Sequence, residues 1–120
     1  MKYKILVVDD EENIRWVLKE SLGDIYNIQI AKNGEDALVK INKEIFDLVL
    51  LDLKLPKISG LEILRKIKKE KRNSIVVILT AYGNKENIKM AKELGVYCYL
   101  TKPFDLLELK SIIKKALDKK

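Results

Sequence analysis

The stretch "DLVLLDLKLPKISG", residues 47–60, decides how the chain folds. Four apolar residues run without interruption into Asp52, and Pro56 and Gly60 follow within one short loop. A continuous apolar run of this length is typical of a strand that is buried on both faces of a parallel sheet. The strand therefore ends by presenting a carboxylate at the edge of the sheet, where ligands of such sheets bind.

The same pattern recurs along the whole chain. Strand-like runs alternate with segments of helical periodicity, and such alternation predicts parallel pairing with right-handed crossovers. We therefore predict an α/β fold, a single doubly wound (βα)5 sandwich, with the alternating stretch 27–31 at an edge of the sheet. The predicted strands are residues 4–8, 27–31, 47–52, 75–80 and 97–101, and the predicted helices are residues 14–22, 33–43, 60–70, 84–95 and 105–117.

Finer expectations concern individual side chains. Asp105 is expected to cap the last helix, Cys98 to be a small buried residue, and Trp16 to lie off the apolar stripe of the first helix. That stripe is expected to consist of Ile14, Val17, Leu18 and Leu22.

Composition limits the class of protein. A length of 120 residues corresponds to one domain, residues 1–120. The net charge is +6, but the basic residues alternate with acidic ones and no aromatic residues accompany them, so we expect no direct nucleic-acid binding. No apolar run approaches the roughly 20 residues that span a bilayer, and the N-terminus does not resemble a signal peptide. With a single cysteine, the chain is expected to be cytoplasmic.

Polar residues follow the predicted strands at their carboxyl ends. Asp9 and Asp10 follow the first strand, Thr80 ends the fourth, and Lys102 comes just after the fifth. Carboxylates about 5–6 Å apart repel by roughly 3 kcal/mol per pair at an effective dielectric constant near 20. A hard divalent cation, Mg²⁺, is the expected partner, because the chain has no histidine and its one cysteine lies within a strand. The alternative is a purely structural role, in which Asp9 and Asp10 only cap the following helix.

Reactivity is limited by what the chain lacks. Without histidine there is no Ser-His or Cys-His pair, and neither "GxxxxGK[ST]" nor "GxGxxG" occurs. A phosphoryl group would therefore arrive already activated on another molecule. Asp52 could accept it as an acyl phosphate, with Lys102 and a metal neutralising the phosphoryl oxygens and Thr80 donating a hydrogen bond.

Four segments together carry a family resemblance: "ILVVDDE" (5–11), "DLVLLDLKLPKISGLEIL" (47–64), "VVILTAYG" (76–83) and "YLTKPFDLLEL" (99–109). Over nearly its whole length the chain resembles the receiver domain of bacterial two-component response regulators. The resemblance implies a flavodoxin-like fold with strand order 2-1-3-4-5. The segments "NIRWVL" (13–18) and "TAYG" (80–83) are similar to receivers of nitrogen-regulation activators, and "TAYG" also to sporulation phosphorelay receivers.

The resemblance also implies a role for each matching position. Asp52 is the expected phosphoacceptor, and Lys54 and Tyr82, each two residues beyond a site residue, are expected to tune how fast the phosphoryl group is lost. The expected Mg²⁺ site comprises Asp10, Asp52, the backbone carbonyl of Lys54 and, through water, Asp9. The expected phosphate-binding and switch residues are Thr80, Ala81, Lys102 and Tyr99, and the expected structural residues are Pro103, often cis in this family, and Gly60.

The implied function is that of a signalling switch and not of an enzyme with its own substrate. A sensor histidine kinase or a phosphotransferase would supply the phosphoryl group, and the surface of residues 85–115 would then bind a partner or a second copy of the chain. Two alternatives remain: a phosphorylation-independent interaction module, and a hydrolase of the haloacid dehalogenase type. The second is disfavoured, because Lys54 stands where those enzymes place a general acid and no cap domain is present.

Overall fold

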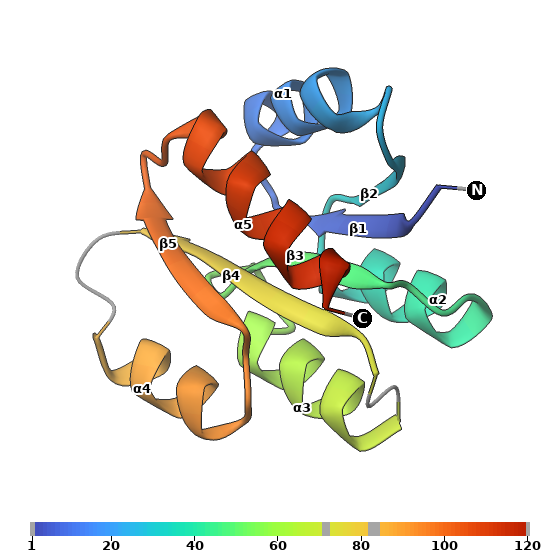
Figure 1. The fold of residues 1–120 in the computed structure, drawn as a ribbon. Helices are drawn as coiled ribbons and strands as arrows, with labels where there is room; N and C mark the ends of the chain where they lie inside the picture. The colour runs from blue at the N-terminus through green and yellow to red at the C-terminus, as the bar shows by residue number, and fades with distance from the viewer. Residues whose placement is uncertain (1, 71–72, 82–84, 120) are drawn as a thin grey trace.

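The computed structural model describes residues 2–70, 73–81 and 85–119 (Figure 1). Strands and helices alternate throughout this part of the chain. Their order is β1 (Lys4–Val8), α1 (Glu12–Leu22), β2 (Asn27–Ala31), α2 (Gly34–Lys43), β3 (Leu48–Asp52), α3 (Gly60–Glu70), β4 (Ile75–Ala81), α4 (Lys85–Glu93), β5 (Cys98–Lys102) and α5 (Leu106–Asp118).

All strand pairs in the sheet are parallel, and the strand order is β2-β1-β3-β4-β5. The predicted α/β class, the doubly wound topology and the edge position of β2 are confirmed. Val8 pairs with both Ala31 and Leu51, and Asp52 pairs with Leu79. This register brings the carboxyl ends of β1, β3 and β4 to the same edge of the sheet.

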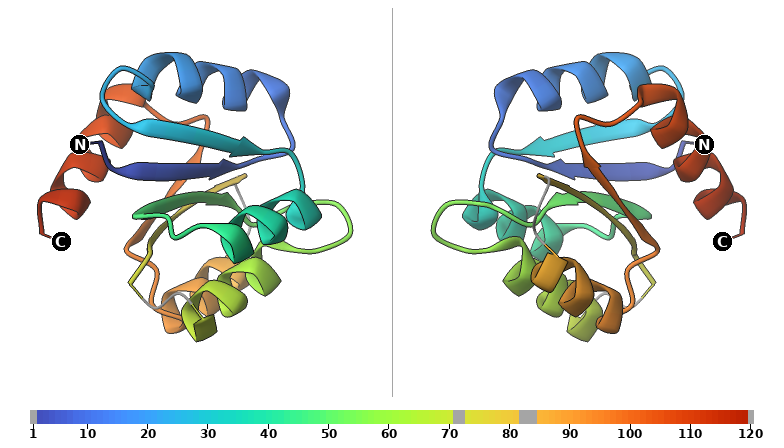
Figure 2. Two further views of the ribbon diagram at one scale, coloured as in Figure 1. Left: turned by 90° about the vertical axis from the view of Figure 1, so that its right-hand side faces the viewer. Right: turned by 90° about the vertical axis from the view of Figure 1, so that its left-hand side faces the viewer.

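Helices cover both faces of the sheet (Figures 1 and 2). Successive strand residues point to opposite faces, so each central strand contributes to two cores. On β1, Leu6 and Val8 pack in the core beneath α2, α3 and α4, while Ile5 and Val7 pack in the core beneath α1 and α5. Because helices cover both faces of the sheet, β1 and β3 consist almost wholly of buried apolar residues, as the sequence predicts.

The first helix departs from its predicted apolar stripe. Leu18 and Leu22 are buried and Ile14 is partly buried, but Val17 is 36% exposed, so the inward placement of Val17 is wrong. Residues 14, 18 and 22 repeat every four positions and form one narrow row, and Val17 lies about 100° around the helix from Leu18. Trp16 is 65% exposed, as its place off the stripe predicts.

Two smaller predictions have mixed outcomes. Asp105 caps α5 by accepting hydrogen bonds from the backbone N–H groups of Leu107 and Glu108, as predicted. Cys98 is only half-buried, because β5 is an edge strand that packs on one neighbour. The described helices are too short to cross a bilayer, since the longest of them, α5, has 13 residues.

Candidate functional site

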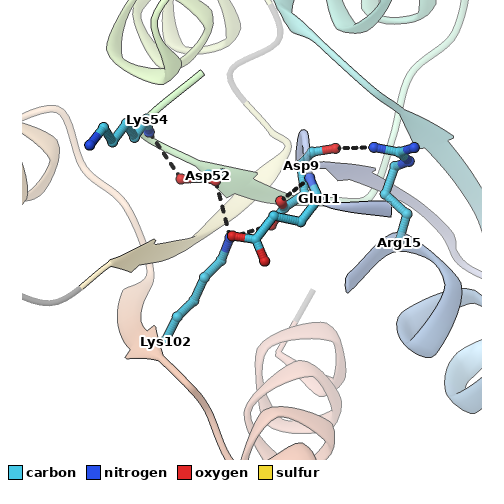
Figure 3. Close-up of polar contacts among 6 residues, drawn as sticks. All are labelled: Asp9, Glu11, Arg15, Asp52, Lys54 and Lys102. Carbon is cyan, nitrogen blue, oxygen red and sulfur yellow. Dashed lines mark hydrogen bonds and ion pairs between the residues drawn. The ribbon is translucent and has the colours of Figure 1, made fainter. Parts of the chain in front are cut away.

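Acidic side chains from two strands meet at the carboxyl edge of the sheet (Figure 3). Asp9 and Asp10 directly follow β1, and Asp52 is the last residue of β3. Each of the three carboxylates offers one oxygen within 4.8 Å of the others. The structure therefore brings together side chains that lie more than 40 positions apart in the chain.

Lys102, the last residue of β5, places its ammonium among these carboxylates. Its Nζ lies 2.7 Å from Asp9 Oδ2, 3.1 Å from Asp52 Oδ2 and 3.6 Å from Glu11 Oε1. Asp9 Oδ2 is fully buried, and in the described part of the chain Lys102 is the one cation that reaches it. Ion pairs this shielded from water are screened far less than those on the surface.

Burial shifts the pKa of the two buried aspartates of the site. Burial is the largest influence on Asp9 and Asp52 and raises the pKa of both carboxyl groups, although Lys102 and backbone N–H groups act in the opposite direction. Burial lowers the pKa of Lys102, but its bonds to Asp9 and Asp52 outweigh that effect and raise it. A further cation would therefore favour the ionised carboxylates.

The loop between β1 and α1 is held at several points. The Asp9 N–H donates to the Ala31 carbonyl at 3.2 Å, and Asp9 Oδ1 accepts from the Glu11 N–H at 2.9 Å. Arg15 Nη1 donates to the backbone carbonyl of Asp9 at 2.9 Å. Glu11 occupies the N-cap position of α1 without a side-chain cap, so neither Asp9 nor Asp10 serves as the N-cap of that helix.

Asp10 differs from the other two aspartates. Its side chain is exposed, and within the described residues it forms no hydrogen bond or ion pair. It lines an open pocket of about 410 Å³ together with Glu11, Asp52, Lys54, Leu55, Pro56, Ala81 and Lys102. An unengaged carboxylate at the mouth of this pocket is free to move toward a ligand.

The loop after β3 fixes Asp52 from the other side. Asp52 Oδ1 accepts a hydrogen bond from the Lys54 N–H at 2.9 Å. Gly60 donates its N–H to the Leu53 carbonyl at 3.0 Å, and a Cβ on Gly60 would lie 2.3 Å from the Asp52 carbonyl oxygen. Only a glycine permits this close approach of α3 to the end of β3.

The three carboxylates fit a magnesium ion. Oxygens bound to one Mg²⁺ at about 2.1 Å are roughly 3 to 4.2 Å apart. The observed limit of 4.8 Å needs only a small closure, which the exposed Asp10 can supply. The donors are all oxygens, which suit Mg²⁺ and not a soft metal ion.

Of the remaining predicted site residues, Thr80, Tyr99 and Pro103 are not among the residues that line this pocket. Thr80 is fully buried near the end of β4, and its Oγ1 has no hydrogen-bond partner among the described residues. Tyr99 is 36% exposed, with Lys92 Nζ 4.8 Å from the centre of its ring. Pro103 follows a cis peptide bond, and Tyr82 lies outside the described residues.

Sequence reasoning overlooked two residues that contact the site. Glu11 lies within the quoted segment 5–11, and its acidic side chain next to two aspartates was a usable signal. Arg15 contacts the Asp9 backbone carbonyl and not a side chain. No sequence pattern indicates such a contact, because the acceptor is the same for every residue type.

Comparison with known proteins identifies the family. The family model of the response regulator receiver domain matches residues 5–114. The chain belongs to this family. The resemblance read from the four sequence segments is thereby confirmed.

Two curated relatives of this receiver domain differ in length. It is 44% identical to sporulation initiation phosphotransferase F of Bacillus subtilis, with 98% of this chain and 95% of that protein covered. It is 38% identical to the alkaline phosphatase synthesis transcriptional regulatory protein PhoP of the same species, with 98% of this chain and 49% of PhoP covered. The chain thus spans nearly all of the first relative and about half of the second.

Solved receiver domains share its fold closely. A CheY-like receiver domain protein from Methanospirillum hungatei superimposes with a TM-score of 0.95 at 33% identity, covering 99% of this chain and 96% of that one. The BeF3-activated DrrB receiver domain gives a TM-score of 0.90 at 36% identity, covering 98% and 99%. Both similarities extend over essentially the whole receiver domain.

Proposed function

We propose that this receiver domain, residues 1–120, is a phosphoryl-accepting switch of a two-component system or phosphorelay in the cytoplasm. The phosphoryl group comes from a phosphohistidine on a sensor histidine kinase or a phosphotransferase and is accepted by Asp52. The observation that carries the proposal is the position of Asp52. It lies in the pocket wall, with Lys102 Nζ 3.1 Å from Oδ2 and Asp9 and Asp10 beside it.

In the transfer, a carboxylate oxygen of Asp52 attacks phosphorus as the bond from phosphorus to the histidine nitrogen breaks. The imidazole leaves with the bonding electron pair, and the product is an acyl phosphate. Lys102 already contacts Asp52, so its ammonium is in place to stabilise the phosphoryl oxygens. The chain thereby promotes its own phosphorylation and dephosphorylation without acting on a separate substrate.

Asp10, Asp52 and the Lys54 carbonyl would hold Mg²⁺ directly, and Asp9 would hold it through water. Bound there, the ion neutralises charge on the transferred group. Within the chain itself, the Lys102 ammonium offsets the negative charge of Asp9 and Asp52. The Lys54 N–H holds one oxygen of Asp52 and leaves the other facing Lys102.

The switch begins at Thr80. Its buried hydroxyl lacks a partner among the described residues and can donate to a phosphoryl oxygen on Asp52. Movement of Thr80 and Ala81 would reposition Tyr99 and the surface of residues 85–115, the α4-β5-α5 face. This face then binds a protein partner, an output domain or a second copy of the chain. Such a shift requires different contacts in the two states.

Two observations from the comparisons support this proposal. One relative carries the name of a phosphotransferase, and one structural neighbour is described as activated by BeF3. A receiver-like module that works without phosphorylation would have no need for the three carboxylates and Lys102 at one pocket. This complete set favours the phosphorylated switch over the interaction module.

The test is uptake of a phosphoryl group from a small acyl phosphate in the presence of Mg²⁺, followed by mass spectrometry of the intact chain. We expect one phosphoryl group per wild-type chain and none on Asp52→Asn. Asp24→Asn, on the connection before β2, is the matched control and should label normally. Full labelling of Asp52→Asn would refute the assignment, and many turnovers of the donor per chain would indicate a hydrolase.

A further inference from the structure

We propose that Arg15 is a positioning residue for the metal site and holds Asp10 where it can bind Mg²⁺. This inference rests on the proposed function, since it concerns the same three carboxylates. It assigns to the first turn of α1 a role toward the ion that the three acidic residues alone do not reveal.

Arg15 contacts the chain on both sides of Asp10. Its side-chain Nη1 donates to the carbonyl of Asp9 at 2.9 Å (Figure 3). Its backbone N–H donates to the carbonyl of Glu11 at 3.2 Å. The Asp9 carbonyl belongs to the peptide that joins Asp9 to Asp10, whereas the bond to the Glu11 carbonyl is the first hydrogen bond of α1. A single residue therefore clamps the short segment that carries the exposed ligand.

Clamping these carbonyls restricts Asp10 because peptide groups are planar. The Asp9 carbonyl belongs to the peptide that joins Asp9 to Asp10, so anchoring its oxygen also orients the Asp10 N–H and Cα. The Asp10 side chain has no contact of its own within the described residues. The backbone that Arg15 holds therefore sets where the Asp10 Cα lies, and the side chain turns about that point.

The side-chain bond is the part that depends on residue type. A guanidinium donating to a carbonyl forms a charge-assisted hydrogen bond, which is stronger than a neutral one. Groups that orient metal ligands in this way typically change metal affinity by about 10- to 100-fold when they are removed. The Asp9 contact is partly buried, so water replaces it poorly.

If Arg15 acted only through its charge, its removal would change the Mg²⁺ affinity in the opposite direction. Arg15 is a cation near a cation site, so removing its charge without any loss of order should tighten Mg²⁺ binding. Loss of the hydrogen bond should instead weaken binding, because Asp10 must then be ordered at the cost of binding free energy. The direction of the change therefore separates positioning from charge.

The experiment is isothermal titration of the folded, unphosphorylated chain with Mg²⁺ alone. We expect Arg15→Met to weaken binding about tenfold and Arg15→Lys, which keeps the charge and one donor, to recover part of the loss. Lys19→Met removes a positive charge one turn further along α1, away from the loop, and should leave affinity unchanged or slightly raised. Circular dichroism confirms that each variant is folded before titration.

Each outcome decides a separate point. Equal or tighter Mg²⁺ binding by Arg15→Met would overturn the positioning role while leaving the proposed function intact. Should Arg15→Met fail to fold, Arg15→Ala, which also removes the side-chain donor, decides in its place: equal or tighter Mg²⁺ binding by Arg15→Ala would likewise overturn the positioning role. Absence of Mg²⁺ binding by the wild-type chain would instead contradict the metal site itself.

Discussion

The ammonium of Lys102 lies among the side chains of Asp9, Glu11 and Asp52. Asp9 is fully buried, and burying an ionised carboxylate without a partner is costly. Lys102 thus lets the acidic edge fold by itself. It also leaves Asp10, the exposed carboxylate, as the group that is ready to engage an ion.

Thr80 yields a prediction at the same scale. Its Oγ1 is buried without a partner among the described residues, and an unsatisfied buried hydroxyl costs about 1–3 kcal/mol. Thr80→Val should therefore raise the free energy of unfolding by about 1 kcal/mol in urea melts. The same substitution should weaken the conformational change that BeF3 and Mg²⁺ induce. Thr101→Val is the control at a half-buried position and should change stability little; a clear loss in Thr80→Val would contradict the prediction.

Residue identities could be predicted better than residue contacts. Asp9, Asp10, Asp52 and Lys102 follow from one rule, since each ends or follows an apolar run that reads as a parallel strand. Arg15 could not be found in that way. Its partner is a backbone carbonyl six positions earlier, and only the actual course of the loop brings the two together.

At the scale of single elements, the junction of β3 and α3 depends on Gly60. A Cβ at this position would lie 2.3 Å from the Asp52 carbonyl oxygen and 2.5 Å from Leu53 Cα. Neither backbone atom can move without shifting Asp52. Gly60→Ala should destabilise the fold by about 2 kcal/mol and slow phosphoryl uptake.

Urea melts and labelling rates measure the two effects of Gly60→Ala. Ser59→Ala, the preceding residue, is the control; it removes only a weak hydroxyl contact to the Glu62 N–H at 3.3 Å and should label normally. Wild-type stability in Gly60→Ala would show that the helix can withdraw from β3 without cost.

The first two turns of α2 carry a pH-dependent ion pair. Burial raises the pKa of Asp36, but the Lys40 ammonium at 2.9 Å and the Lys32 N–H outweigh it, so the pKa falls below its ordinary value of 3.8. A lowered carboxyl pKa stabilises the fold above the unfolded value, and this contribution is lost as pH falls through the folded value.

The pair is about one-third exposed, so its contribution is small. Asp36→Asn should cost about 0.5 kcal/mol at pH 7, and the difference from wild type should vanish as the pH falls below 3.8 in urea melts at several pH values. In a Lys40→Met background the same substitution should have less effect. A difference that persists in acid would mean that Asp36 acts through something other than this charge.

Element types could be predicted from periodicity, whereas the width of a buried face could not. Residues 4–8 and 60–70 were predicted as strand and helix with the observed bounds. Val17 was wrongly placed inward because periodicity alone does not say how wide the contact of α1 with the sheet is. That width depends on α5, which packs on the same face of the sheet as α1, and on the neighbouring edge strand β2.

At the scale of the whole molecule, we expect Mg²⁺ binding at the three carboxylates to stabilise the fold. Without Mg²⁺, Asp10→Asn should raise the free energy of unfolding by about 1 kcal/mol, because it relieves repulsion at a site where solvent screens part of the effect. With Mg²⁺ at 100 times its dissociation constant, the free energy of unfolding of the wild type should rise by about 2.7 kcal/mol, and that of Asp10→Asn should rise by less.

Thermal melts with EDTA and with Mg²⁺ measure both parts of this prediction. Asp24→Asn serves as the control, because it removes one negative charge from the connection before β2 and should not alter the Mg²⁺ effect. A loss of stability in metal-free Asp10→Asn would show that Asp10 is chiefly structural.

The topology of the molecule could be predicted because local signals agreed with one another. Alternating strands and helices permit only parallel pairing, and the most apolar runs belong at the centre. The position of β2 at one edge followed from its alternating pattern, but the order of the remaining strands came from family resemblance. Periodicity alone does not say which central strand lies beside which.

The carboxylates lie at the carboxyl end of the sheet. The start of β1 and the end of α5 lie at the opposite end (Figure 1). Lys2 and Asp118 even line a common surface hollow there. A fluorescent protein or a surface tether fused to either terminus would therefore leave the reactive edge open to a docking donor. A domain immobilised by either terminus should therefore still accept a phosphoryl group at the carboxyl edge of the sheet.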